Sequence, residues 1–164
     1  MKRQLLIMRH GKSSWANSQL MDHERALNKR GQRDAPAMGR LRERLELVPD
    51  YVILSDSQRT TETFEAMWPA MPKINPIYAP SLYLGNLRNI QTECADLSGS
   101  LGRVLVLGHN PGFSLAVTQL SGKPVELKTA YIAVLEVESD SWSALNDLGA
   151  WRLLHTLTPA QAHG

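Results

Sequence analysis

The chain has 164 residues, of which 43% are hydrophobic, and this length suits one domain spanning residues 1–164. Its 18 basic residues nearly balance its 16 acidic ones, so the net charge of +2 argues against a nucleic-acid partner. The single cysteine excludes an intrachain disulfide, and no zinc-type spacing of Cys and His occurs, so we expect no metal and no cofactor. The apolar run after Lys2 and Arg3 is too short for a signal peptide or a membrane span, which favours the cytoplasm and no membrane partner.

The first strand is predicted at residues 5–8, where an apolar run ends abruptly in charged residues. A helix is predicted from about residue 28 to about residue 47, with Asn28 as its N-cap and an apolar stripe at spacings of three and four. Four charged residues of this helix are expected mostly on its outer face: Arg40, Arg42, Glu43 and Arg44. Pro36 predicts a kink, or a restart of the helix with Asp34 as a second cap.

The rest of the chain continues the alternation of strands and helices. Expected strands lie at residues 51–54, 74–78 and 104–107, and expected helices at residues 60–67, 87–97 and 113–120. Two β-rich segments, 129–137 and 151–157, are joined by a polar connection at 139–149 and predict later strands near the sheet edge. This alternation is typical of a three-layer α/β/α single domain with a mostly parallel central sheet.

Three of the predicted strands end in residues that bind anions. The first strand leads to Arg9 and His10, the second to Arg59, and the fourth to His109 and Asn110. Because parallel strands place their carboxyl ends at one edge of the sheet, we expect these residues to meet in one crevice. The two guanidinium groups suit phosphoryl oxygens, and the start of the following helix adds backbone N–H donors. The sequence therefore predicts a site for phosphate, vanadate or tungstate.

A phosphate pocket becomes catalytic when it holds a nucleophile, and His10 is the candidate. A neutral imidazole attacks phosphorus, and a reference pKa of about 6.5 keeps it neutral at pH 7. Arg9 and Arg59 are expected to lower the pKa of His10 further. We expect its other ring nitrogen to donate to a carbonyl, which fixes the tautomer. Attack would form a covalent phosphohistidine that water hydrolyses, with His109 donating to the phosphoryl oxygens as an imidazolium or moving protons.

Four motifs follow one another along the chain: Arg9-His10-Gly11; Asp22-x-x-Arg25 with Leu27-Asn28-x-x-Gly31; Ser55-x-x-x-Arg59-Thr60-x-x-Thr63; and Gly108-His109-Asn110-Pro111. In this order and spacing they resemble the histidine phosphatase superfamily of phosphoglycerate-mutase-like folds. The stretch Lys12-Ser13-Ser14-Trp15 and residues 27–36 are most similar to the small SixA-type phosphohistidine phosphatases. The resemblance spans residues 5 to about 137. It implies that His10 is the phosphorylated nucleophile, that Arg9, Arg59 and His109 form the phosphate pocket, and that Arg25 also binds substrate.

The loop after the third predicted strand departs from the family pattern. Mutases and phosphomonoesterases of the superfamily carry a general-acid Glu there, whereas residues 81–86 of this chain contain no carboxylate. An alkoxide leaving group needs a proton in the transition state, but phosphohistidine leaves through an imidazole nitrogen. The sequence therefore favours cleavage of a P–N bond in a phosphorylated protein, and Asp22 or Asp56 remains a possible replacement for the acid.

Two other functions stay open at this stage. One is a small-molecule phosphomonoesterase or mutase of the same superfamily, and the other is a module that binds phosphate or phosphoproteins without turnover. Three further side chains have structural expectations: Ser55 shapes its turn, Cys94 faces the core, and Trp15 either packs or lines the pocket.

Overall fold

The computed structural model describes residues 1–67 and 74–164. In these residues the strands are β1 (Lys2–Arg9), β2 (Tyr51–Leu54), β3 (Ile77–Tyr78), β4 (Arg103–Gly108), β5 (Ile132–Glu138) and β6 (Arg152–Leu157). The α-helices are α1 (Lys29–Arg44), α2 (Gln58–Met67), α3 (Leu87–Cys94), α4 (Gly112–Ser121) and α5 (Pro159–His163). Three 3₁₀ helices connect them: η1 (Asp22–Glu24), η2 (Pro80–Leu82) and η3 (Trp142–Asn146).

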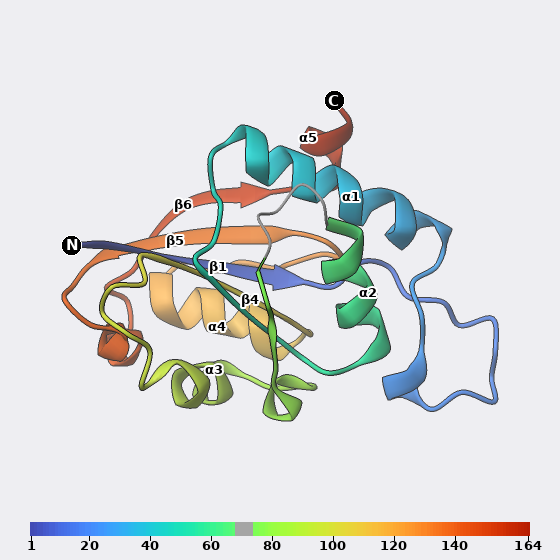
Figure 1. The fold of residues 1–164 in the computed structure, drawn as a ribbon, viewed down its shortest axis with the longest axis horizontal. Coiled ribbons are helices and arrows are strands. Elements are labelled where there is room, and N and C mark those ends of the chain that lie inside the picture. Colours follow the sequence, from blue (N-terminus) through green and yellow to red (C-terminus); the bar gives the residue numbers. More distant parts are fainter. Residues whose placement is uncertain (68–73) are drawn as a thin grey trace.

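The strands form one sheet in the order β3-β2-β4-β1-β5-β6, with helices on both of its faces (Figure 1). β1 pairs in parallel with β4, β4 with β2, and β2 with β3. β5 runs antiparallel to β1, and β6 runs antiparallel to β5. The predicted three-layer domain with a mostly parallel sheet is therefore confirmed, and of the two later strands β6 forms the edge while β5 lies inside.

Alternate residues of the central strands feed two separate cores. On one face, Leu5, Ile7 and Val106 pack with α3, α4 and η3. On the other face, Leu6 and Met8 pack with α1 and α2. Burial on both faces explains why these strands read as continuous apolar runs in the sequence. α5 lies against α1 at the upper end of the view in Figure 1.

The first long helix differs from its prediction at its end, at Asp34 and at Arg42. It ends at Arg44 rather than near residue 47. It continues through Pro36, which excludes the predicted restart, while the kink, the other alternative, stays a prediction. Asp34 is buried and pairs with His163 of α5 instead of capping a second helix. Arg42 was expected outside but is fully buried, because its Nη1 donates to the Leu47 carbonyl 3.0 Å away and closes the end of the helix. The predicted Asn28 cap is confirmed, since its side chain accepts from the Gly31 N–H.

Other predicted elements are shorter than expected. β3 comprises only Ile77–Tyr78 and α3 stops at Cys94, while β5 starts at Ile132. The connection at 139–149 is not simply polar, because η3 buries Trp142 and Leu145 against the core. Cys94 is buried as predicted. None of the helices in the described residues is long and apolar enough to cross a membrane.

Candidate active site

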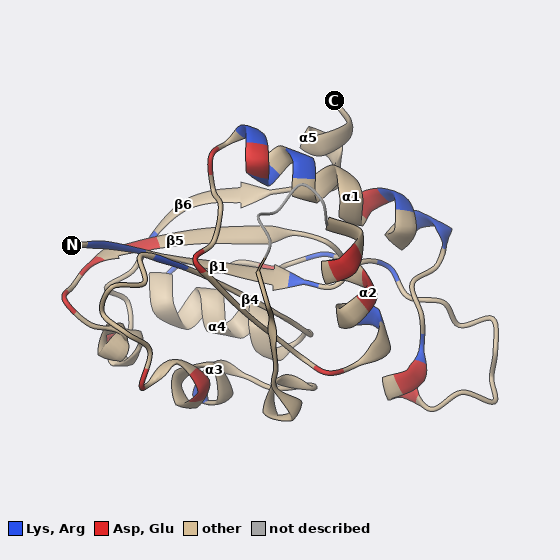
Figure 2. Ribbon diagram, viewed as in Figure 1, with Lys and Arg blue, Asp and Glu red and all other residues tan. Residues whose placement is uncertain are grey.

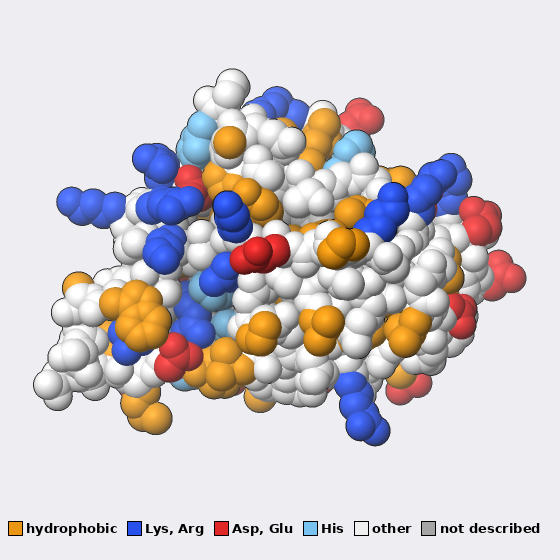
Figure 3. Space-filling model, turned by 180° about the vertical axis from the view of Figure 1, so that it is seen from behind, with side chains coloured by type: hydrophobic (Ala, Val, Ile, Leu, Met, Phe, Trp, Pro, Cys, Tyr) orange, Lys and Arg blue, Asp and Glu red, His pale blue; other side chains and the backbone are white. Residues whose placement is uncertain are grey.

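The carboxyl ends of β1, β2 and β4 open onto a hollow of about 250 Å³. Its lining consists of Arg9, His10, Lys12, Ser13, Trp15, Asp22, Arg59, Leu84, His109, Asn110 and Thr129. In the space-filling view, Lys, Arg and His side chains gather in this hollow beside a hydrophobic patch (Figure 3). The predicted convergence of Arg9, His10, Arg59 and His109 is therefore observed, whereas Arg25 lies outside the lining.

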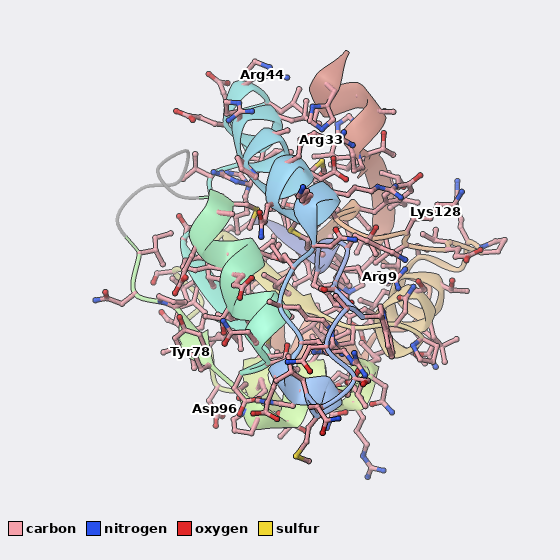
Figure 4. The ribbon with its side chains drawn as sticks, turned by 90° about the vertical axis from the view of Figure 1, so that its right-hand side faces the viewer. Arg9, Arg33, Arg44, Tyr78, Asp96 and Lys128 are labelled. Atoms are coloured by element: carbon pink, nitrogen blue, oxygen red, sulfur yellow. The ribbon has the colours of Figure 1, made fainter. Side chains whose placement is uncertain are left out.

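Parallel pairing explains how residues about fifty positions apart reach the same hollow. Arg9 is paired with Gly108 in neighbouring strands, so the residues that follow each of them, His10 and His109, leave the sheet side by side. Their ring centroids are 5.2 Å apart. Figure 4 looks onto this edge of the sheet, where Arg9 lies among the side chains and Lys128 extends outward. In the charge-coloured ribbon, basic residues mark the end of β1 and acidic residues mark η1 (Figure 2).

His10 has the geometry of a nitrogen nucleophile. Its Nδ1 lies 2.6 Å from the Gly11 carbonyl, so Nδ1–H donates there and Nε2 carries the lone pair. This confirms the predicted orientation by a carbonyl. The pKa of His10 is lowered to about 4, first because the ring is buried and only then because Arg59 and Arg9 are nearby. The direction was predicted, but the main cause is desolvation rather than the arginines.

Arg59 connects the nucleophile to the loop that precedes α1. Its Nε donates to His10 Nε2 at 3.2 Å, while Nη1 donates to the Asp22 carbonyl at 2.7 Å. Its Nη2 also donates to Asp22 Oδ2 at 2.9 Å. A phosphoryl group that takes up the Arg59 donors would therefore release the Nε2 lone pair for attack.

Two buried polar atoms of the lining have no hydrogen-bond partner among the described residues: Arg9 Nε and His109 Nδ1. Buried polar atoms are almost always satisfied, and each unmet one costs about 1 to 3 kcal/mol. Arg9 is fixed at its other end, since Nη1 donates to the Leu127 carbonyl at 3.2 Å. Arg9 and His109 therefore bring a guanidinium and an imidazole to the wall of the hollow beside His10.

His109 is oriented by the strand next to its own. Its Nε2 lies 2.8 Å from Ser55 Oγ, which also accepts from the Ser57 N–H. When the Ser55 hydroxyl donates to Nε2, Nδ1 carries the hydrogen and is a neutral donor. Burial, with the neighbouring His10 second, lowers the pKa of His109 to about 3. Of the two roles expected for His109, this lowered pKa disfavours the imidazolium donor at neutral pH, and the role in moving protons stays a prediction. Ser55 holds this ring in addition to shaping its turn.

Tyr83 is the part of the site that the sequence did not reveal. Its hydroxyl donates to Asp22 Oδ2, and its ring packs edge-on against His109 with centroids 5.3 Å apart. It comes from the loop that lacks the general-acid Glu, so this loop supplies a phenol instead of a carboxylate. Tyr83 and Arg59 together lower the pKa of Asp22, which makes Asp22 a poor proton donor at neutral pH. Asp56 lies outside the lining and hydrogen-bonds to His23.

Arg25 and Asn110 have structural partners. The Arg25 guanidinium lies 3.8 Å from the centroid of the Trp15 ring, and its Nε is 3.8 Å from Asp22 Oδ1. Asn110 lines the hollow, but its Nδ2 donates to the Leu127 carbonyl and its Oδ1 accepts from Ser114. Among the described residues, no group of three or more His, Cys, Asp or Glu is arranged to hold a metal ion.

The sheet order and the histidine–arginine hollow define a phosphoglycerate-mutase-like α/β protein. The family model of the histidine phosphatase superfamily, branch 1, matches residues 5–82. An uncharacterised chloroplastic protein of Arabidopsis thaliana is 31% identical over 172 residues, covering 96% of this chain and 78% of the relative. The chain therefore belongs to the histidine phosphatase superfamily.

Solved structures show the same fold. The SixA protein of Agrobacterium tumefaciens matches with a TM-score of 0.82 and 24% identity, over 96% of this chain and 98% of that one. The protein histidine phosphatase SixA in complex with tungstate matches with a TM-score of 0.78 and 21% identity over the same shares of the two chains. A phosphoglycerate mutase of Bacillus anthracis matches less closely, with a TM-score of 0.65 and 14% identity, over 88% of this chain and 96% of the mutase. The fold of this chain is thus SixA-like.

Proposed function

We propose that the protein is a phosphohydrolase that works through a covalent phosphohistidine intermediate on His10. The observation that carries this proposal is an oriented, neutral imidazole beside the Arg59 guanidinium. His10 Nδ1 donates to the Gly11 carbonyl, and Arg59 Nε lies 3.2 Å from His10 Nε2 in the hollow that Arg9 and His109 also line. An oxyanion bound there would accept from Arg59 and lie beside Arg9 and His109. The tungstate complex of the similar SixA fold supports an oxyanion as the ligand.

The reaction has two displacements at phosphorus. In the first, His10 Nε2 bonds to phosphorus while the bond to the leaving group breaks, and the leaving atom takes a proton from solvent. In the second, water bonds to phosphorus, the Nε2–P bond breaks, and the water proton is lost to solvent. Inorganic phosphate departs and His10 returns to its neutral form. Arg9, Arg59 and His109 stabilise the charge on the phosphoryl oxygens in both steps.

Phosphohistidine on a protein is the substrate that we favour. The loop at 81–86 contains no carboxylate, and the lowered pKa of Asp22 keeps that side chain ionised. An alkoxide leaving group would therefore lack a carboxylic acid as its proton donor, whereas an imidazole nitrogen leaves more readily. The chain would act in the cytoplasm or, by analogy with its plant relative, in a plastid.

Replacing His10 with Ala tests the nucleophile. We expect hydrolysis of phosphoramidate, followed as released phosphate, to fall by at least a thousandfold because no covalent intermediate forms. A chelator is expected to leave the wild-type rate unchanged. Retained turnover in His10→Ala would place the nucleophile elsewhere.

Substrate comparison separates the remaining functions. A wild-type protein that binds phosphate but releases none from phosphoramidate would be a binding module. A kcat/KM that is higher for 3-phosphoglycerate or an aryl phosphate than for phosphoramidate would indicate a phosphomonoesterase or mutase instead.

A further inference from the structure

Trp15 is an exposed aromatic residue at the edge of the hollow. The residue is 66% exposed, yet it belongs to the lining together with His10 and Arg59. Tryptophan is large and is usually well buried, so such exposure beside a polar pocket requires an explanation. Neither of the two proposed displacements at phosphorus uses the Trp15 side chain.

The indole ring is held in a defined position. The Arg25 guanidinium stacks on it with 3.8 Å between its central carbon and the ring centroid. Arg25 is itself fixed, because its side chain is only 13% exposed and lies 3.8 Å from Asp22. The two backbone segments are also joined, since Ser14 N–H donates to the Ala26 carbonyl at 2.7 Å. One face of the ring is therefore covered, and the exposure of Trp15 resides on the other face and the edge.

The direction of attack places the leaving group near this ring. In an in-line displacement the leaving group departs from the side of phosphorus opposite the nucleophile. His10 is only 6% exposed and lies at the base of the hollow, so the opposite side is the opening. Trp15 and Leu84, which is 58% exposed, border the hollow on its accessible side.

We propose that the free face of Trp15, with Arg25 stacked behind it, is a platform for a flat ring in the leaving group of the substrate. This inference rests on the proposed function and deepens it, because it makes Trp15 a specificity-determining residue for imidazole or aryl leaving groups over leaving groups without a ring. Offset stacking of two rings is worth about 0.5 to 1.5 kcal/mol beyond area burial, which corresponds to about two- to tenfold in kcat/KM.

The test compares two types of P–N substrate in wild type, Trp15→Ala and Trp15→Phe. N-phosphoimidazole and free phosphohistidine carry a ring, and phosphoramidate does not. In Trp15→Ala we expect kcat/KM to fall about two- to tenfold for the ring substrates and to stay unchanged for phosphoramidate. Trp15→Phe retains a flat ring and is expected to keep most of the preference. Leu148→Ala, which removes a 60% exposed side chain outside the lining, is the matched control.

Three results would overturn the proposal. Equal losses for both substrate types would assign Trp15 to the fold of the loop, and no loss for either would leave it without a role. A loss seen only with a phosphorylated protein would mean that Trp15 contacts the protein around the phosphorylated residue. A binding measurement distinguishes failure of the platform from failure of the proposed function: phenylphosphonate should bind more tightly than methylphosphonate in wild type, and this difference should shrink in Trp15→Ala whether or not turnover occurs.

Discussion

Asp22 is the one acidic side chain among the described residues that line the hollow. It holds Arg59 through its carbonyl and its carboxylate, and it also accepts from Tyr83. A carboxylate next to a phosphoryl site repels the phosphoryl charge, while its hydrogen bonds keep Arg59 in place. The two effects oppose each other and are separable by a substitution that removes only the charge.

Asp22→Asn keeps an oxygen for Arg59 and Tyr83 but removes the negative charge. Vanadate is expected to bind about fivefold more tightly, equivalent to about 1 kcal/mol for a partly exposed charge. Calorimetric titration at two salt concentrations measures this, and the gain should shrink at high salt because ions screen the repulsion.

Asp56→Asn is the control for this prediction, since Asp56 pairs with His23 outside the lining. Its vanadate affinity should equal that of wild type. If Asp22→Asn instead weakened vanadate binding, Asp22 would act mainly by positioning Arg59.

The residues of the site divide into those that a sequence pattern reveals and those that it does not. His10, Arg59 and His109 were predictable because each follows an apolar strand. The part played by Tyr83 was not, because it depends on how its loop folds back over the end of a neighbouring strand. The main cause of the low pKa of His10 was also missed, since burial is a property of the folded chain.

At the scale of elements, the start of α1 is attached to the loop that carries Lys12. Asn28 N–H donates to the Lys12 carbonyl at 2.9 Å, and its side chain caps the helix. A Cβ added to Gly31 would lie 2.3 Å from that same carbonyl oxygen. The main-chain atoms of the loop and of the helix are therefore in direct contact, and only glycine leaves room for this contact at position 31.

Gly31→Ala is expected to lower both stability and activity. The loop must move to accommodate the methyl group, which should cost about 1 to 3 kcal/mol in the free energy of unfolding and displace the wall of the hollow. Urea unfolding and phosphoramidate hydrolysis measure the two effects. Gly102→Ala is the control, because its Cβ would meet no atom closer than 3.4 Å. Equal stability of the two variants would contradict the close contact at Gly31.

Element centres were more predictable than element ends. β1, β2 and β4 are buried on both faces, so their sequences are unbroken apolar runs. The end of α1 depends on Arg42, whose side chain turns inward to donate to the Leu47 carbonyl. The charge of Arg42 alone predicts that this residue faces solvent. β3 lies at the sheet edge and pairs only with β2, and this pairing involves just its two residues, Ile77 and Tyr78.

At the scale of the whole molecule, two buried histidines make stability depend on pH. The pKa of His10 is about 4 and that of His109 is about 3 when folded, against about 6.5 in an unfolded chain. Below about pH 6.5 the unfolded chain takes up protons that the folded chain does not. The free energy of unfolding should therefore fall as the pH drops from about 6.5 to about 4, by on the order of 3 kcal/mol per histidine.

Urea unfolding at several pH values measures this loss. His109→Asn removes one of the two groups and should flatten the pH dependence between about pH 6.5 and 4. His155→Asn, at an exposed position on β6, should keep the wild-type dependence. Identical curves for wild type and His109→Asn would show that the buried ring does not link stability to protonation.

Arg59 is held in the hollow by hydrogen bonds to the carbonyl and the carboxylate of Asp22. Restricting a long side chain costs up to about 2 kcal/mol of conformational entropy. For Arg59 this entropy is lost on folding and not on binding. If an oxyanion binds as proposed, it would replace Asp22 as the hydrogen-bond partner of Arg59 donors that are already in place. Phosphate, vanadate and tungstate should therefore bind without movement of the backbone. Soaking these ions into crystals grown without them would be a practical route to the bound structure.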